Sequence, residues 1–166
     1  MQNDFIDGAL GSKEAVAILP AVTERIKAAK SNGEAVIATL DTHFENYMET
    51  SEGKKLPVPH CIKGTDGWKI PDEIMSALGE AVFVEKPAFG STKLPGFIKD
   101  IAGESNLSIE LCGLCTDICV VSNALILKAH FPDAEISVRA ACCAGVTPQK
   151  HAAALETMAS CQINII

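Results

Sequence analysis

Three parts of this sequence carry side chains that are suited to catalysis. Cys119 lies in the run CGLCTDICVV at residues 112–121, Lys86 follows a short apolar run, and Asp41 and His43 follow another. A cysteine thiolate is a nucleophile that a neighbouring ammonium group stabilises. Aspartate and histidine are ligands that suit zinc, iron or manganese. The sequence therefore offers both a nucleophile with a cationic partner and the beginning of a metal site.

The surroundings of Cys119 predict a strand, a tight glycine turn and a helix. Residues 107–112 have the pattern of a buried strand, and Thr116 is a suitable N-cap for a helix that runs to about His130. Cys119 then occupies the third helical position, where unpaired backbone N–H groups and the helix dipole favour a thiolate. The backbone N–H groups of Cys115 and Cys119 are candidate donors to an oxyanion. The alternative is that Cys119 is a small apolar residue that packs the helix onto a sheet.

Strands and helices alternate along the chain. The helical patterns cover residues 15 to about 33, with Pro20 at a helix start or a kink, and then 71–78, 116–130 and 147–160; the strand patterns cover 35–40, 81–85, 107–112, 134–140 and 162–166. This alternation predicts an α/β fold, with a parallel sheet covered by helices on both faces, in one domain over residues 1–166. Because ligands bind at the carboxyl ends of parallel strands, Asp41, His43 and Lys86 are expected at one site.

Residues 41–70 form a long segment without hydrophobic periodicity. It contains three glutamates, His60 and Trp68. Loops of this length inside a compact domain are usually functional. We therefore expect this segment to contribute to the site.

The composition of the chain limits which kinds of partner it can bind and which cellular compartment it suits. The formal net charge of the 166 residues is -7 and no basic run is present, which argues against nucleic acid or an anionic membrane surface as a partner. No apolar stretch approaches the roughly 20 residues that span a bilayer, and no signal-peptide pattern opens the chain. Seven cysteines without a small secreted scaffold fit a reducing compartment. These features predict a cytoplasmic protein with a small-molecule substrate.

Three motifs resemble those of the isochorismatase-like cysteine hydrolases, the family that includes the nicotinamidases. Residues 113–120 match the nucleophile loop, roughly G-[apolar]-[small]-T-D-x-C-V, with Cys115 in the small-residue position. Residues 84–90 (VEKPAFG) resemble the segment that carries the family's catalytic lysine, and residues 59–65 (PHCIKGT) resemble the segment of its second histidine. The resemblance covers nearly the whole chain.

The resemblance implies a fold, an activity and catalytic residues. The fold is a three-layer α/β/α sandwich with a mostly parallel six-stranded sheet in the order 3-2-1-4-5-6. The activity is hydrolysis of a small amide through a thioester on Cys119, as in the nicotinamidases of NAD metabolism, with Lys86 beside the nucleophile. A cis peptide bond is expected at Leu114–Cys115, and we expect a homo-oligomer.

The resemblance also implies a metal site, and three aromatic residues separately suggest a pocket for a planar ring. Asp41, His43 and His60 match the family's metal ligands, and the ion is expected to be zinc, with iron or manganese as alternatives. Glu52 is the expected carboxylate ligand by its spacing before His60, and Glu49 is the alternative. The candidate ring pocket consists of Phe5, Trp68 and Phe89, which have an alternative role as core residues that anchor loops. His130 and His151 match no family site.

The beginning of the chain departs from the family pattern. The family's opening motif is a strand that ends in aspartate, followed by an apolar residue and Gln-Asn-Asp-Phe, and Met1 fills the apolar position here. The expectation is that the first strand and the catalytic aspartate lie before residue 1, with Asp4 as the alternative base. Other functions stay open: another hydrolase of the isochorismatase type, an inactive binding scaffold, or a thiol oxidoreductase that uses the C-x-x-C spacing of Cys112 and Cys115.

Overall fold

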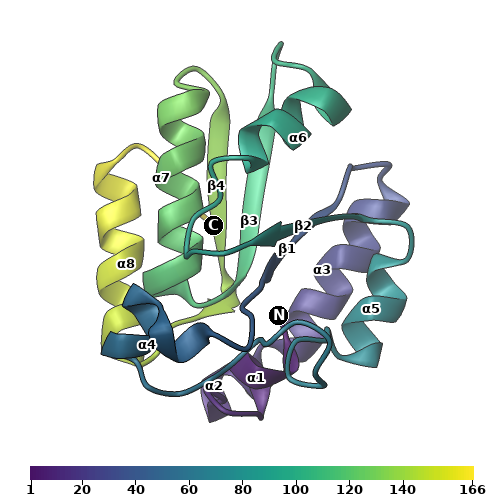
Figure 1. Ribbon diagram of the computed structural model, residues 1–166. Coiled ribbons are helices and arrows are strands. Elements are labelled where there is room, and N and C mark those ends of the chain that lie inside the picture. Colours follow the sequence, from purple (N-terminus) through teal and green to yellow (C-terminus); the bar gives the residue numbers. More distant parts are fainter.

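Helices and parallel strands alternate along the computed structural model, which describes residues 1–166 (Figure 1). Its strands are β1 (Ile37–Asp41), β2 (Val82–Lys86), β3 (Ser108–Leu114), β4 (Glu135–Ala144) and β5 (Asn164–Ile165). Its α-helices are α1 (Asn3–Ile6), α2 (Lys13–Ala17), α3 (Leu19–Ser31), α4 (Ser51–Lys55), α5 (Asp72–Leu78), α6 (Leu94–Ala102), α7 (Val121–His130) and α8 (Pro148–Ser160). A 3-10 turn, η1 (Tyr47–Glu49), and a π turn, η2 (Thr116–Val120), complete the elements. None of the helices combines the length and the hydropathy of a membrane span.

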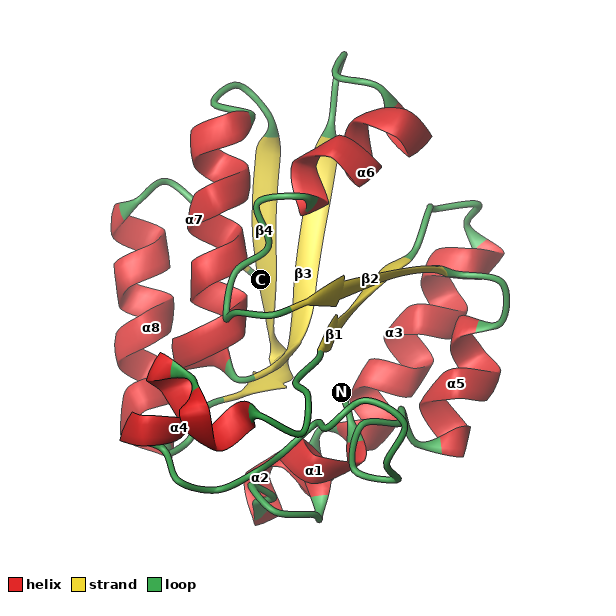
Figure 2. Ribbon diagram, viewed as in Figure 1, coloured by secondary structure: helices red, strands yellow, loops and turns green.

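All strand pairs are parallel, as the alternation of strands and helices predicts. The strands form two sheets, β1-β2 and β3-β4-β5 (Figure 2). In the first sheet the last pair in register is Asp41 with Lys86, so the two strand ends lie side by side. In the second sheet the register shifts between Leu111 and Gly113 of β3, just before the nucleophile loop. A mixed α/β fold with parallel sheets is therefore confirmed, and its five strands lie in two sheets where a single six-stranded sheet was expected.

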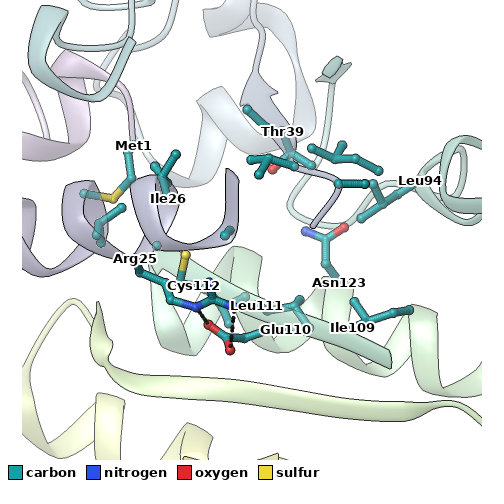
Figure 3. Close-up of a pocket in the computed structure, with 18 of the residues that line it drawn as sticks. Met1, Arg25, Ile26, Thr39, Leu94, Ile109, Glu110, Leu111, Cys112 and Asn123 are labelled. Atoms are coloured by element: carbon teal, nitrogen blue, oxygen red, sulfur yellow. Dashed lines mark hydrogen bonds and ion pairs between the residues drawn. The ribbon is translucent and has the colours of Figure 1, made fainter. Parts of the chain in front are cut away.

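A cavity of about 720 Å³ separates the two sheets (Figure 3). It is lined by Ile37, Ala38 and Thr39 of β1 and by all of β3. Because β1 pairs only with β2 and β3 pairs only with β4, both strands turn an unpaired edge toward this space. We call this space the inter-sheet slot.

Helices cover both faces of the second sheet. Neighbouring residues of a strand point to opposite faces, and Cys142 and Cys143 of β4 accordingly enter two different apolar clusters. Cys143 packs with buried side chains of α6, α7 and α8, whereas Cys142 packs with those of α3 and α5. The strand ends are thus held between two layers of helices.

The structure differs from the predicted elements at several places, and it adds α1 and α6, which lie outside the predicted helical ranges. The helix predicted from residue 15 is broken at Ile18, and Pro20 lies in the first turn of α3, where proline is tolerated. The segment 41–70 contains η1 and α4, which are too short to show a hydrophobic period. Thr116 is not an N-cap, because a π turn begins at that residue and its hydroxyl bonds a side chain instead.

Candidate active site

A lysine–cysteine pair lies where β2 and η2 come together. The Lys86 Nζ is 3.5 Å from the Cys119 Sγ and donates a hydrogen bond to the Ala88 carbonyl at 3.1 Å. The Lys86 side chain is only 3 % exposed and Cys119 only 8 % exposed. A buried ammonium at this distance stabilises a thiolate much more than one in water does.

Burial and the lysine act in opposite directions on Cys119. Burial raises the pKa of the Cys119 thiol, the Lys86 charge lowers it, and the Asp41 carboxylate raises it. The net direction is upward, so the resting residue is a thiol, whereas the helix-dipole argument predicts a thiolate. Nucleophilic attack by Cys119 therefore requires a base that takes its proton.

The loop before Cys119 is fixed by contacts on both sides. Its Leu114–Cys115 peptide bond is cis, the conformation that the family resemblance implies. The Cys115 backbone N–H donates to the Cys119 sulfur and favours its thiolate form. The Thr116 hydroxyl lies 2.8 Å from the Nδ1 of His151, and an Asp117 carboxylate oxygen accepts the Val146 N–H at 2.9 Å. The Cys115 N–H thus points at the place where a reacting atom would lie.

A cluster of potential metal ligands lies on the other side of Lys86. One ligand atom from each of Asp41, His43 and His60 lies within 4.8 Å of the others, and all three residues are buried. Glu52 joins them, because its Oε1 is 3.6 Å from the Nε2 of both histidines. Glu49 makes no contact with the cluster, so Glu52 is the carboxylate at this place.

The cluster fits a cation. Asp41 Oδ1, His43 Nε2 and Glu52 Oε1 are buried and make no hydrogen bond, a costly arrangement unless another partner binds them. His60 Nδ1 lies 2.9 Å from the Val58 carbonyl, which only accepts, so Nδ1 carries the proton and Nε2 keeps its lone pair. Two imidazoles and carboxylates form a ligand set that suits zinc and related ions.

Backbone contacts bring the histidines together from distant parts of the chain. The His43 N–H donates to the Cys61 carbonyl and the His43 carbonyl accepts the Lys63 N–H, both at 2.9 Å. The Tyr47 ring is wholly buried and makes edge contacts with both imidazoles, at centroid distances of 4.8 Å to His43 and 5.1 Å to His60. These contacts hold the loop that carries His60 against the end of β1.

Gln2 and Asp4 are structural partners of the site. The Gln2 side chain is buried, accepts the Asp41 N–H at 2.7 Å and donates to the Asp41 carbonyl at 2.8 Å, which fixes the backbone of a candidate ligand. The Asp4 carboxylate accepts the backbone N–H of Cys61 at 2.7 Å and that of Ala9 at 3.2 Å. Both Asp4 oxygens are therefore engaged with backbone groups, which argues against Asp4 as the catalytic base.

The three aromatic residues expected to form one pocket lie on three segments around the site. The Phe5 ring makes an edge contact with His60 at 5.5 Å and lines the inter-sheet slot together with Cys119. The Trp68 indole donates to the Thr42 hydroxyl at 2.9 Å, and Phe89 is 44 % exposed. No aromatic contact joins the three rings.

The thiols of the C-x-x-C pair, Cys112 and Cys115, have raised pKa values, whereas the thiols of a redox motif have lowered ones. Burial raises the pKa of Cys115 to about 12, and the pKa of Cys112, which is exposed on the wall of the inter-sheet slot, is raised as well. Catalytic thiols of oxidoreductases have lowered pKa values and lie at helix N-termini, whereas Cys112 lies within β3 and both thiols are free. The structure thus supports the hydrolase interpretation over the redox one.

A buried cysteine with a lysine partner, set beside a histidine and carboxylate cluster at the ends of parallel strands, defines this protein as an enzyme of the hydrolase class. The family model described as Isochorismatase domain matches residues 1–166, so the chain belongs to the isochorismatase family.

Similar proteins and solved structures support this assignment. A Bacillus subtilis (strain 168) protein described as "Uncharacterized isochorismatase family protein PncA" is 29% identical over 171 residues, covering 95% of this chain and 90% of that protein. The Pyrococcus horikoshii pyrazinamidase in complex with zinc is 28% identical, with a TM-score of 0.80 over 100% of this chain and 94% of its own. The Streptococcus mutans UA159 pyrazinamidase/nicotinamidase is 27% identical, with a TM-score of 0.85 over 99% of this chain and 95% of its own.

Proposed function

We propose that this protein hydrolyses the C–N bond of a small planar amide, with nicotinamide as the leading substrate. The observation that carries the proposal is the buried pair of Lys86 Nζ and Cys119 Sγ, 3.5 Å apart and next to the Asp41, His43 and His60 cluster. Two similar structures, 27% and 28% identical, are a pyrazinamidase/nicotinamidase and a pyrazinamidase. Both substrates that these names imply are planar heteroaromatic amides.

The catalytic step assigned to Cys119 is attack on the amide carbonyl. A base takes the Cys119 proton, the sulfur bonds to the carbonyl carbon, and the negative oxygen accepts hydrogen bonds from backbone N–H groups at Cys115 and Cys119. The proton passes to the departing nitrogen and ammonia leaves a thioester. Water then hydrolyses the thioester, and Lys86 keeps the sulfur's developing charge balanced at each stage.

We assign the metal site to Asp41, His43, His60 and Glu52, with zinc as the first candidate. The unpartnered buried atoms of this cluster and the zinc in the Pyrococcus horikoshii relative support the assignment. When bound, the ion supplies a Lewis acid that orients a ring nitrogen or activates water. Iron and manganese suit the same ligand set.

We further propose that one more parallel strand fills the inter-sheet slot and completes the sheet. The observed order is β2-β1, then the slot, then β3-β4-β5, so a strand in the slot gives a six-stranded sheet in the order 3-2-1-4-5-6. Each unpaired buried backbone group costs about 1–3 kcal/mol, which such a strand would recover. Met1, Lys86 and Cys119 line the slot together, so an aspartate that ends such a strand there would supply the base that the Cys119 thiol requires.

The test of the activity is ammonia release from a panel of amides. The panel contains nicotinamide, pyrazinamide, benzamide and acetamide, with isochorismate as a non-amide comparison, and Cys119→Ala as the inactive reference. Preference for nicotinamide and pyrazinamide, absent in Cys119→Ala, supports the proposal. Hydrolysis of isochorismate without amide turnover would replace it with the other activity of the superfamily.

A further inference from the structure

A buried asparagine joins the two segments that carry the catalytic pair. Asn123 of α7 is 5 % exposed and follows the π turn of Cys119 (Figure 3). Its Nδ2 donates to the Cys119 carbonyl at 2.8 Å and to the Phe89 carbonyl at 3.2 Å, and its Oδ1 accepts the Ser91 N–H at 2.9 Å. One side chain thus bonds the backbone of the nucleophile and the backbone of the loop that follows Lys86.

The contact with Cys119 compensates for an irregular turn. In η2 the backbone bonds run over five residues, as from Val120 N–H to the Cys115 carbonyl at 3.0 Å. Side chains one helical turn later bond the carbonyls of this stretch: Ser122 Oγ donates to Ile118 and Asn123 Nδ2 to Cys119. π turns of this kind occur often at functional sites.

The other two contacts bear on the position of Lys86. Residues 87–91 follow Lys86 directly, and the Ala88 carbonyl in this loop accepts a hydrogen bond from the Lys86 Nζ at 3.1 Å. The loop lies tightly on α7, because a Cβ at Gly90 would meet Ile126 Cδ1 at 2.5 Å and Ser122 Cβ at 3.3 Å. The docking of the loop therefore sets where the Ala88 carbonyl lies, and this carbonyl holds the ammonium group together with the Asp41 carboxylate, whose Oδ1 is 3.4 Å from the Lys86 Nζ.

We propose that Asn123 is a positioning residue of the proposed hydrolase, which sets the distance between the Lys86 Nζ and the Cys119 Sγ by docking the 87–91 loop onto the nucleophile turn. This inference rests on the proposed function, in which Cys119 is the nucleophile. Asn123 touches no reacting atom and acts through the two residues that it holds. Asn123 therefore affects the turnover number kcat, and it affects substrate binding much less.

The test measures how the rate of Cys119 alkylation by iodoacetamide changes between pH 7 and pH 12, a range that extends well above the ordinary cysteine pKa because burial raises the pKa of this thiol. Tandem mass spectrometry locates the modified thiol, because fragments of the tryptic peptide of residues 100–128 distinguish Cys119 from Cys112 and Cys115, and the other four thiols lie on other peptides. The charged and titratable groups that face Cys119 are Lys86, Asp41, Cys115 and the Met1 amino group. A change in the access of iodoacetamide to Cys119 alters the alkylation rate at the high-pH plateau. Displacement of Lys86 instead moves the pH midpoint of alkylation, because an adjacent opposite charge shifts the pKa of a thiol by about 1–3 units.

Two variants disturb the docking by independent routes. Asn123→Leu removes all three hydrogen bonds at similar volume, and Gly90→Ala adds a Cβ that crowds Ile126 and Ser122 of α7 without removing any hydrogen bond of Asn123. Ser122→Ala is the matched control, because it removes a bond to the same π turn and none to the loop. We expect both test variants to raise the midpoint by at least about half a pH unit, and Ser122→Ala to leave it unchanged.

The Lys86→Met background shows whether Asn123 acts through the lysine. Lys86→Met alone raises the midpoint, and adding Asn123→Leu or Gly90→Ala then moves it no further, since coupled residues are not additive. A midpoint equal to wild type in both test variants, or an undiminished shift in the Lys86→Met background, overturns the proposal. If Asn123→Leu does not unfold cooperatively, it is not properly folded, and the midpoint of the Gly90→Ala variant then tests the proposal.

Turnover provides a separate readout. We expect Asn123→Leu to lower kcat for nicotinamide about 10-fold or more with KM within about twofold, the pattern of an interaction that serves the chemical step. Alkylation of Cys119 needs no substrate, so the two tests can fail separately. If the protein hydrolyses no amide, the proposed function is wrong. The pH midpoints of alkylation still show whether Asn123 positions Lys86 against Cys119.

Discussion

Asp41 Oδ1 lies 3.4 Å from the Nζ of Lys86, its partner in the register of β1 and β2. The same oxygen is 3.6 Å from His43 Nε2, so one carboxylate borders both the candidate metal cluster and the catalytic pair. A carboxylate shared between a cation site and an ammonium group makes the charge at one depend on occupancy of the other.

The first prediction separates the nucleophile from its neighbouring thiols. Cys119→Ala abolishes amide hydrolysis, while Cys112→Ala and Cys115→Ala keep measurable turnover, because only Cys119 contacts Lys86. Cys115 acts through its backbone N–H, which the alanine variant retains. Steady-state ammonia release is the measurement, and wild-type turnover in Cys119→Ala would disprove a thioester mechanism.

A second prediction concerns metal content. The purified protein, loaded with zinc and then desalted, holds about one ion per chain, and His60→Ala holds less than about a tenth of that, since it removes one of the proposed ligands. His130→Ala is the control, because His130 lies at the end of α7 against Phe131, away from the cluster. Elemental analysis decides, and equal zinc in His60→Ala and wild type would remove the site.

The third prediction is a pH dependence of stability that arises at Glu110. Hydrogen bonds from Arg139 and Arg25 together lower the pKa of Glu110 to about 2, against the counteracting effect of burial. A lowered folded-state pKa contributes stability that is present above the ordinary value of 4.5 and is lost as the pH falls toward 2. Allowing for solvent screening of this partly exposed group, the contribution is about 1–2 kcal/mol.

Urea unfolding between pH 6 and pH 2.5 measures this contribution. Wild type loses about 1–2 kcal/mol more over this range than Glu110→Gln does. Glu104→Gln serves as the control, because its partner Lys99 is exposed and surface pairs of this kind contribute little. Parallel curves for wild type and Glu110→Gln would contradict the prediction.

The fourth prediction tests the strand proposed for the inter-sheet slot. A chain with about eight added residues before Met1, in the pattern of a buried strand that ends in aspartate, unfolds at a higher temperature than the 166-residue chain and hydrolyses amides faster. The same extension ending in asparagine gains stability without the gain in rate, because an amide cannot take the Cys119 proton. An extension that changes neither property would exclude this occupant of the slot.

The sequence predicts the site residues that lie at strand ends better than those that meet only in space. Asp41, His43 and Lys86 follow apolar runs, and the parallel arrangement of their strands brings them together by a general rule. Asn123 and Gln2 show no such pattern, because each becomes part of the site through hydrogen bonds to residues more than 30 positions away.

The local backbone geometry around Cys119 could also not be predicted from the sequence pattern. Thr116 has the residue type of an N-cap, but its hydroxyl bonds His151 of α8, a partner that the sequence does not reveal. The resulting π turn places Cys119 at a different position from that of an α-helix that starts at Thr116. Tertiary contacts therefore override a local capping preference here.

The unpaired edges of β1 and β3 have a consequence for hydrogen exchange. Along a parallel strand, successive residues direct their backbone amides to alternate sides, so over residues 108–111, before the register shift of β3, every second N–H points to β4 and the others point into the slot. With the slot empty, deuterium enters β3 in a period of two, fast at one residue and slow at the next. An occupied slot abolishes the alternation, so the periodicity of exchange along β3 reports occupancy residue by residue.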